Sequence, residues 1–256
     1  MKKLAKKRQA RKVIKPKNKV YFEKPKNNYP TLYLCADISI NHCGLVLLDD
    51  SKCKVAAITD LSKPSLKYPE EIFKSDFNDL KNSQFGFRLF RSLMLRDYHY
   101  LNMFDYLFSD YNLYNLYNIE LYMEGYAYGA KGTIFEIAEI TQTFKMFAYD
   151  YFFRNRVQNF ELYTLPPMTL KKFITGDGHA TKNDIKNELY KKYSINFTDY
   201  DCELKGSDIS EDLNDAFALV KFGSEFNKWQ LGEKTEHNYS DYFNSLKEET
   251  ILGFRR

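Results

Sequence analysis

The stretch that most constrains the fold is an apolar run that ends in a carboxylate. Leu32-Tyr33-Leu34-Cys35-Ala36 leads directly into Asp37, and the run 44–48 (Gly-Leu-Val-Leu-Leu) follows a few residues later. Two short apolar runs this close together are typical of buried strands that pair as a hairpin. The pattern therefore predicts a sheet that carries Asp37 at the end of its first strand.

Three more acids occupy comparable places further along the chain. Glu124 closes a second apolar run that begins at Ile119. Asp212 and Asp215 lie three residues apart, a spacing that puts both on one face of a helix. Any one of these acids alone is more often solvated, because most charged side chains are exposed. Taken together, acids delivered by distant core segments indicate one converging acidic site.

Four carboxylates in one site repel each other and do not all stay ionised without cations nearby. Hard divalent ions such as Mg²⁺ or Mn²⁺ take oxygen ligands and relieve that repulsion. Two such ions about 4 Å apart are the usual machinery for in-line displacement at a phosphodiester. We therefore expect Asp37, Glu124, Asp212 and Asp215 to hold two metal ions.

The order of the elements predicts an α/β fold with a mixed sheet. Glycines and prolines bound the later helices, and Thr181 is placed to cap one of them. The apolar spacing predicts helices at about 85–107, from about 134, from Pro166 through Lys172, after Thr181, and at about 208–222. Short apolar runs predict five strands, at 32–37, 44–49, 55–60, 119–124 and 160–164.

Charge is distributed unevenly along the 256 residues. Residues 1–26 carry twelve Lys or Arg and one acid, a net charge of +11, which leaves −7 on the rest of a chain whose total is +4. We expect residues 1–30 to be a basic, disordered arm, 31–223 the folded domain that carries the acidic site, and 224–256 a C-terminal extension. Such an arm suits non-specific contact with phosphates. It also suits a solubilising tail or a targeting signal, and both alternatives stay open.

No run of about 18 apolar residues is present, so no membrane span is expected. The four cysteines are scattered and indicate a reducing compartment. We expect a cytoplasmic protein, and organelle targeting by the basic N-terminus is an open alternative. Zinc at Cys35, His42, Cys43 and Cys53 is disfavoured, because paired C-x₂₋₄-C spacing is missing.

Four segments together resemble the RuvC-type Holliday junction resolvases. They are Ala36-Asp37-Ile38-Ser39 with the following hairpin, Met123-Glu124, the run 212–218 (Asp-Leu-Asn-Asp-Ala-Phe-Ala), and the run 170–182 with its Lys-Lys, Thr-Gly and final Lys. The resemblance spans roughly residues 31–222. It implies an RNase H-like fold, a five-stranded mixed sheet flanked by helices, a homodimer, and Mg²⁺-dependent nicking of a four-way DNA junction that leaves 5′-phosphate and 3′-OH ends.

The resemblance also implies roles for individual residues. Asp37, Glu124, Asp212 and Asp215 match the metal-binding carboxylates of the family, and Lys182 matches a lysine of its active site. The loop after Glu124 is closer in wording to viral or phage members, and an aromatic there is expected to stack on an unpaired base. The residues expected to contact DNA are Lys171, Lys172, Lys182, Tyr126, Tyr128 and Lys131.

Several alternatives remain at this point. Long intervals before Glu124, with extra residues at 61–84, and before Asp212 leave open whether four-way junctions, flaps or other branched DNA are cut. An actin- or sugar-kinase-like ATPase also opens with an Asp-bearing hairpin, but its second Asp-Gly phosphate loop is not found. Gly176-Asp177-Gly178 matches neither phosphate-binding glycine motif and is expected to be a turn near a DNA phosphate. A non-catalytic DNA-binding protein is the third possibility.

Overall fold

The computed structural model describes residues 29–38, 42–49, 52–60, 72–75, 99–125, 134–198, 209–235 and 252–255. The basic arm, most of the 61–84 insertion, and Tyr126, Tyr128 and Lys131 lie outside these described residues.

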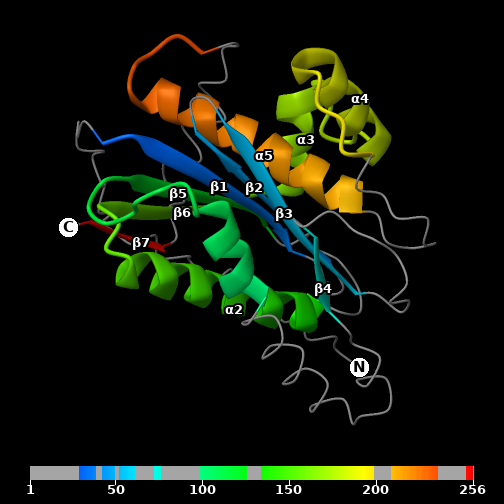
Figure 1. The fold of residues 1–256 in the computed structure, drawn as a ribbon. Helices are drawn as coiled ribbons and strands as arrows, with labels where there is room; N and C mark the ends of the chain where they lie inside the picture. Colours follow the sequence, from blue (N-terminus) through cyan, green and yellow to red (C-terminus); the bar gives the residue numbers. More distant parts are fainter. Residues whose placement is uncertain are drawn as a thin grey trace, which may run out of the picture.

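A mixed sheet forms the centre of the molecule, and all five predicted strands are present in it (Figure 1). The first three strands form an antiparallel meander, and two later strands run parallel to the first. The order across the sheet is β4-β3-β2-β1-β5-β6-β7. The five predicted strands are β1 (Thr31–Ile38), β2 (His42–Leu48), β3 (Cys53–Asp60), β5 (Asn118–Glu124) and β6 (Asn159–Leu165).

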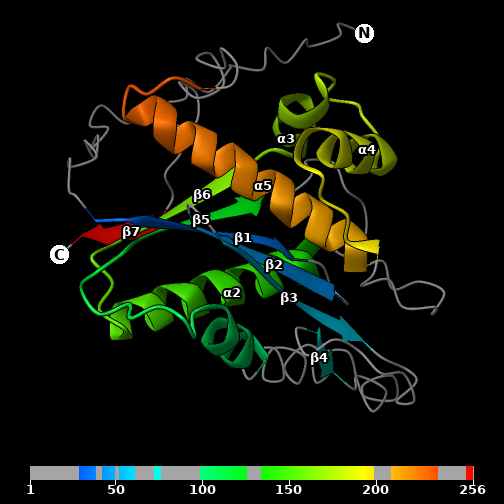
Figure 2. The ribbon, with the colours of Figure 1, turned by 45° about the horizontal axis from the view of Figure 1, so that its top comes forward.

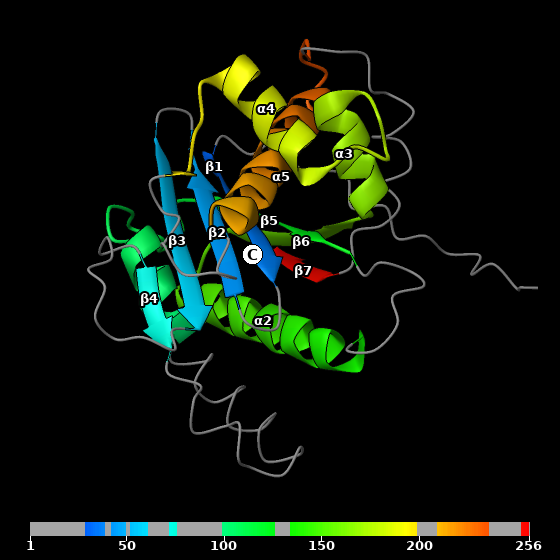
Figure 3. The same cartoon turned by 90° about the vertical axis from the view of Figure 1, so that its right-hand side faces the viewer.

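Two short strands that were not predicted extend this sheet at its edges, which makes seven strands in place of five. β4 (Ile72–Ser75) pairs in parallel with β3, and β7 (Leu252–Arg255) pairs antiparallel with β6. Figure 3 shows β4 and β7 at opposite sides of the sheet. Four residues are too few for a period of two to be recognised in a sequence. The central strand order and the covering helices still confirm the mixed α/β, RNase H-like fold class.

Helices cover both faces of the sheet (Figures 1 and 2). α2 (Ile134–Arg154) and the helical residues 99–107 cover one face, and α5 (Ile209–Gln230) packs on the other. Side chains of β1 alternate between the two layers, as a strand requires. Leu32, Leu34 and Ala36 join the α2 side, and Tyr33 and Cys35 join the α5 side. The strand is therefore buried on both faces.

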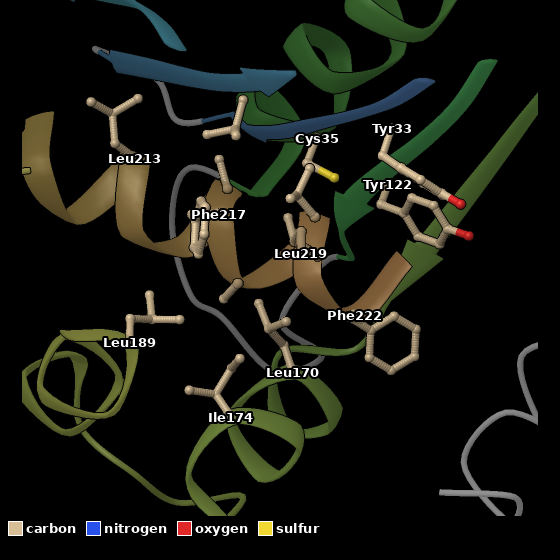
Figure 4. Packing of buried hydrophobic residues seen from close by; sticks show 14 of the residues in the cluster. Tyr33, Cys35, Tyr122, Leu170, Ile174, Leu189, Leu213, Phe217, Leu219 and Phe222 are labelled. Atoms are coloured by element: carbon tan, nitrogen blue, oxygen red, sulfur yellow. The ribbon is translucent and has the colours of Figure 1, made fainter. Parts of the chain in front are cut away.

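α5 is a buried helix that lies between the sheet and two smaller helices, α3 (Pro167–Thr175) and α4 (Lys182–Tyr193). In Figure 4, Leu170, Ile174 and Leu189 approach α5 from α3 and α4, and Cys35 and Tyr122 approach it from the sheet. The helix continues eight residues past the predicted end at residue 222. The predicted domain boundary at 223/224 therefore falls inside α5.

Local sequence signals define how α3 and α4 begin and end. Pro167 starts α3, and Gly176 ends it with φ of 85°, the left-handed conformation that glycine adopts without strain. Thr181 begins α4 through a reciprocal capping box with Asp184. The predicted cap is confirmed, and it fixes the direction in which Lys182 leaves the backbone. No helix within the described ranges is long and apolar enough to cross a membrane.

Candidate active site

Sheet register brings Asp37 and Glu124 to the same edge of the sheet. β1 and β5 are parallel neighbours, with Ala36 opposite Met123, so the two acids are the next residues along their strands. Tyr33 and Cys35 on β1 and Tyr122 on β5 belong to the core beneath α5. Because side chains alternate along a strand, Asp37 and Glu124 face α5 as well. The two predicted strand-end carboxylates are therefore adjacent.

A close approach between β2 and α5 brings Asp212 to the same place. Gly44 pairs with Asp37 across the hairpin. A Cβ atom added to Gly44 would lie 2.8 Å from both the carbonyl carbon and the carbonyl oxygen of Asp212. Real Cβ atoms do not approach backbone atoms this closely, so glycine is what allows α5 to lie against the hairpin here. Asp212 and Asp215 are both largely buried in the first turns of α5.

The electrostatics of Asp37 show that the four acids interact. Desolvation raises the pKa of the Asp37 carboxyl well above its usual value, and the charges of Asp212, Asp215 and Glu124 raise it further. The positive charge of Lys182 opposes this rise in the pKa of Asp37. The four carboxylates predicted from the sequence therefore influence one another across three elements, β1, β5 and α5.

Glu124 and Asp215 are shifted in the same direction. Burial, together with the charge of Asp215, raises the pKa of Glu124 to about 7, although Lys171 and Lys182 oppose the shift. Burial raises the pKa of Asp215 to about 6, with Glu211 adding to the shift and the same two lysines opposing it. Carboxyl groups with pKa values near neutrality bind protons and cations competitively, because both neutralise the same unfavourable charge.

The predicted lysines divide into two groups. Lys171 on α3 and Lys182 at the start of α4 both act on Glu124 and Asp215. Lys172 is exposed on α3. The structure therefore brings Lys171 and Lys182 to the acidic cluster and leaves Lys172 on the surface. His179 is exposed in the turn between α3 and α4, and its backbone N–H donates to Asp177 Oδ1.

Glu211 is a site residue that the sequence analysis missed. Lys182 Nζ donates to Glu211 Oε2 at 2.5 Å, which joins the start of α4 to the first turn of α5. Desolvation opposes the charge on Lys182, but the Glu211 hydrogen bond and the charges of Asp215 and Glu211 outweigh it, so the pKa of Lys182 is raised. The available signal was the acidic pair Glu211-Asp212 at the start of a helix.

The donor chemistry of this cluster fits a hard divalent cation, because all four predicted ligands are carboxylates and burial raises the pKa of three of them, Asp37, Glu124 and Asp215. In the described part of the chain, however, no three His, Cys, Asp or Glu side chains are arranged to hold one ion together. Residues that would hold it are Asp37, Glu124, Asp212 and Asp215, and this assignment stays a prediction.

Comparison with known proteins comes from solved structures alone, since no protein-family model and no curated protein sequence matches this chain. The chain is similar to Thermus thermophilus RuvC, with 17% identity and a TM-score of 0.39 over 78% of this chain and 96% of that one. The T. thermophilus RuvC in complex with Holliday junction substrate gives 14% identity and the same TM-score and coverage.

A third similar structure is the yeast mitochondrial Holliday junction resolvase Ydc2, with 15% identity and a TM-score of 0.44 over 86% of each chain. These proteins are bacterial and mitochondrial, so the viral or phage-like kinship stays a prediction. The chain is thus similar in structure to proteins of the family that its sequence motifs resemble.

Proposed function

We propose that this chain is a metal-dependent endonuclease that cuts branched DNA, with a four-way junction as its first candidate substrate. The observation that carries the proposal is the Asp37 carboxyl, whose pKa is raised by burial and by Asp212, Asp215 and Glu124 together. Acids from three elements gathered beside two lysines suit phosphodiester hydrolysis better than a structural role. An uncompensated acidic cluster costs stability, and a cation-dependent reaction gives it a use.

In the proposed mechanism, the four carboxylates hold the cations and the lysines face the DNA backbone. Two divalent ions held by these residues would supply a water of lowered pKa for attack and would stabilise the leaving 3′-oxygen. Lys182 and Lys171 add positive charge beside the acids and so attract the phosphate to be cut. The hairpin and α5 keep the acids in place, because both are anchored in the hydrophobic core.

The first test is cleavage of synthetic four-way, three-way and flap DNA with Mg²⁺. Asp37→Asn and Glu124→Gln should each reduce the cleavage rate by at least about 100-fold, more than loss of a residue that only supports a metal ligand. Binding of the same DNA, followed by fluorescence anisotropy in Ca²⁺, should survive, because these acids hold metal rather than DNA. Both variants should fold, since each removes a charge that burial disfavours.

A matched control is Asp150→Asn. Asp150 is exposed on α2, on the opposite face of the sheet, and pairs with Arg154 at 2.7 Å. This variant should cut at the normal rate. Cleavage at the normal rate by Asp37→Asn would overturn the site assignment. If the wild-type protein hydrolysed ATP but cut no DNA, the ATPase would be favoured. If it bound DNA without cutting it, a non-catalytic DNA-binding protein would be favoured.

A further inference from the structure

The contact between Lys182 and Glu211 links two elements at the border of the acidic cluster. Lys182 is the first residue of α4, and the capping box of Thr181 and Asp184 fixes that end of the helix. Glu211 lies in the first turn of α5 and directly precedes Asp212. The 2.5 Å ion pair is partly exposed, with the Lys182 side chain 53% and the Glu211 side chain 35% accessible.

Lys182 has other carboxylates within its electrostatic reach. Asp215 and Asp37 both stabilise its charge, and Lys182 in turn stabilises the ionised form of Glu124. A lysine carries a compact charge on a flexible four-carbon stem, so its ammonium group can move between nearby acids. An ammonium group placed between Asp37 and Asp215 would neutralise the same oxygens that a divalent cation uses.

We propose that Glu211 is a positioning residue that holds the Lys182 ammonium at the border of the acidic site and away from Asp37 and Asp215. In this position the lysine faces the DNA backbone and leaves the carboxylate oxygens to cations. The proposal rests on the proposed function for the role of the site. The effect of the Lys182–Glu211 ion pair on cation binding can be measured without DNA.

A double-mutant cycle measured with Ca²⁺ alone tests this role. Four proteins are compared by isothermal titration calorimetry after chelator treatment: wild type, Glu211→Gln, Lys182→Gln and the double variant. Glu211→Gln should weaken Ca²⁺ binding by about five- to tenfold, on the scale of couplings between contacting residues. Lys182→Gln should strengthen Ca²⁺ binding, because the positive charge that interacts with Asp215 and Asp37 is removed.

The decisive comparison is the effect of Glu211→Gln in the two backgrounds. If Glu211 acts through the lysine, its removal should change Ca²⁺ affinity by less than about twofold once Lys182 is Gln, since only the screened long-range charge of Glu211 is then lost. An equal fold-change in both backgrounds would overturn the proposal and reduce Glu211 to a general source of negative charge. Absence of Ca²⁺ binding by the wild type would overturn it too.

Glu188→Gln is the matched control. Glu188 lies on α4 and pairs with Lys191 at 3.4 Å and with Lys192 at 3.7 Å, so its removal changes the net charge equally in a similar helix contact. Ca²⁺ affinity should be unchanged in this variant. If Glu188→Gln lost as much Ca²⁺ affinity as Glu211→Gln, the loss would come from the change in net charge and not from the position of Glu211.

Failure of this inference is distinguishable from failure of the proposed function. Coupled Ca²⁺ binding in a protein that cuts no DNA would support the positioning role and overturn the nuclease. If the protein cuts junctions but the effects of Glu211→Gln and Lys182→Gln on Ca²⁺ affinity are simply additive, the nuclease would be supported and the positioning role overturned. Glu211→Asp keeps the charge on a shorter side chain, so its Ca²⁺ affinity should lie between those of wild type and Glu211→Gln.

Discussion

At the scale of single residues, the notable property is that Asp37, Glu124 and Asp215 all hold protons more tightly than usual. Desolvation is the largest cause for each, and neighbouring carboxylates add to it in all three cases. Their ionised forms are therefore disfavoured in the folded protein relative to the unfolded chain. The cluster lowers stability at neutral pH, and neutralising any member should return part of that stability.

This property predicts how stability depends on pH. Between pH 4.5, the ordinary value for a Glu carboxyl, and about 7, the folded protein binds more protons at Glu124 than the unfolded chain does. The contribution of this residue to the free energy of unfolding should therefore fall as pH rises through that range and level off above about 7. At pH 8, Glu124→Gln should be more stable than wild type by about 1–3 kcal/mol in metal-free buffer.

Urea unfolding of wild type and Glu124→Gln at pH 5 and pH 8, with a chelator present, measures this difference. Other titrating groups are common to both proteins, so the comparison isolates Glu124. Equal losses of stability in the two proteins between pH 5 and pH 8 would show that the Glu124 pKa is not raised. Added Mg²⁺ should narrow the gap at pH 8, because bound cations stabilise the wild type by mass action.

At the scale of elements, the sequence predicted the parts of the fold that have a strong apolar pattern. Strands buried on both faces, such as β1 and β5, are continuous apolar runs, and Pro167, Gly176 and Thr181 mark helix ends by known backbone preferences. The end of α5 was misjudged, although Phe222, Phe226 and Trp229 continue the spacing of a helix past residue 223. The edge strands β4 and β7 depend on their neighbours and carry little signal of their own.

The candidate site was predictable to the extent that its residues lie at element ends. Asp37 and Glu124 close apolar strands, and the spacing of Asp212 and Asp215 places them on one helix face. Glu211 could not be predicted as a site residue in the same way. Its contact with Lys182 depends on how α4 packs near α5, and no local sequence pattern encodes that packing. For Tyr126, Tyr128 and Lys131, the predicted DNA contacts lie outside the described residues and stay predictions.

The contact between β2 and α5 makes a prediction at this scale. In Gly44→Ala, the new Cβ would meet backbone atoms of Asp212 at 2.8 Å, so α5 must shift at its acidic end. We expect a loss of about 1–3 kcal/mol in stability from overpacking. Ca²⁺ binding should weaken as well, because Asp212 moves relative to Asp37. Urea unfolding and calorimetry measure the two effects.

Gly223→Ala is the comparison for this variant. Its Cβ would lie 2.5 Å from the Tyr122 ring, eleven residues further along α5 and about 16 Å from Asp212. This change should lower stability and leave Ca²⁺ affinity intact. If Gly44→Ala binds Ca²⁺ as the wild type does, the close approach to Gly44 does not position the carboxylates.

At the scale of the whole molecule, charge is divided between a strongly basic first segment and a net negative remainder. The negative part repels DNA, and the lysines at the acidic cluster offset this only locally. The net positive charge available for phosphate contacts therefore belongs to residues 1–26. Affinity for DNA and the chemistry at the acidic site are expected to depend on different parts of the chain.

Deleting residues 1–26 should weaken DNA binding and flatten its dependence on salt. Each lost phosphate contact lowers the slope of log affinity against log salt by about 0.9. Titrations of labelled junction DNA between low and moderate salt measure this slope, and Ca²⁺ binding to the shortened protein serves as the control and should be unchanged. A slope equal to that of the full chain would show that the arm does not contact phosphates.

One consequence of β7 concerns how the protein behaves when shortened. Residues 252–255 pair with residues 159–162 on the outer side of β6 and cover the backbone of that part of the strand. Trimming these few residues would expose a row of unpaired amide and carbonyl groups beside an otherwise complete sheet. The shortened molecule would then present an open strand edge to other copies of itself, and it would be prone to self-association by strand pairing.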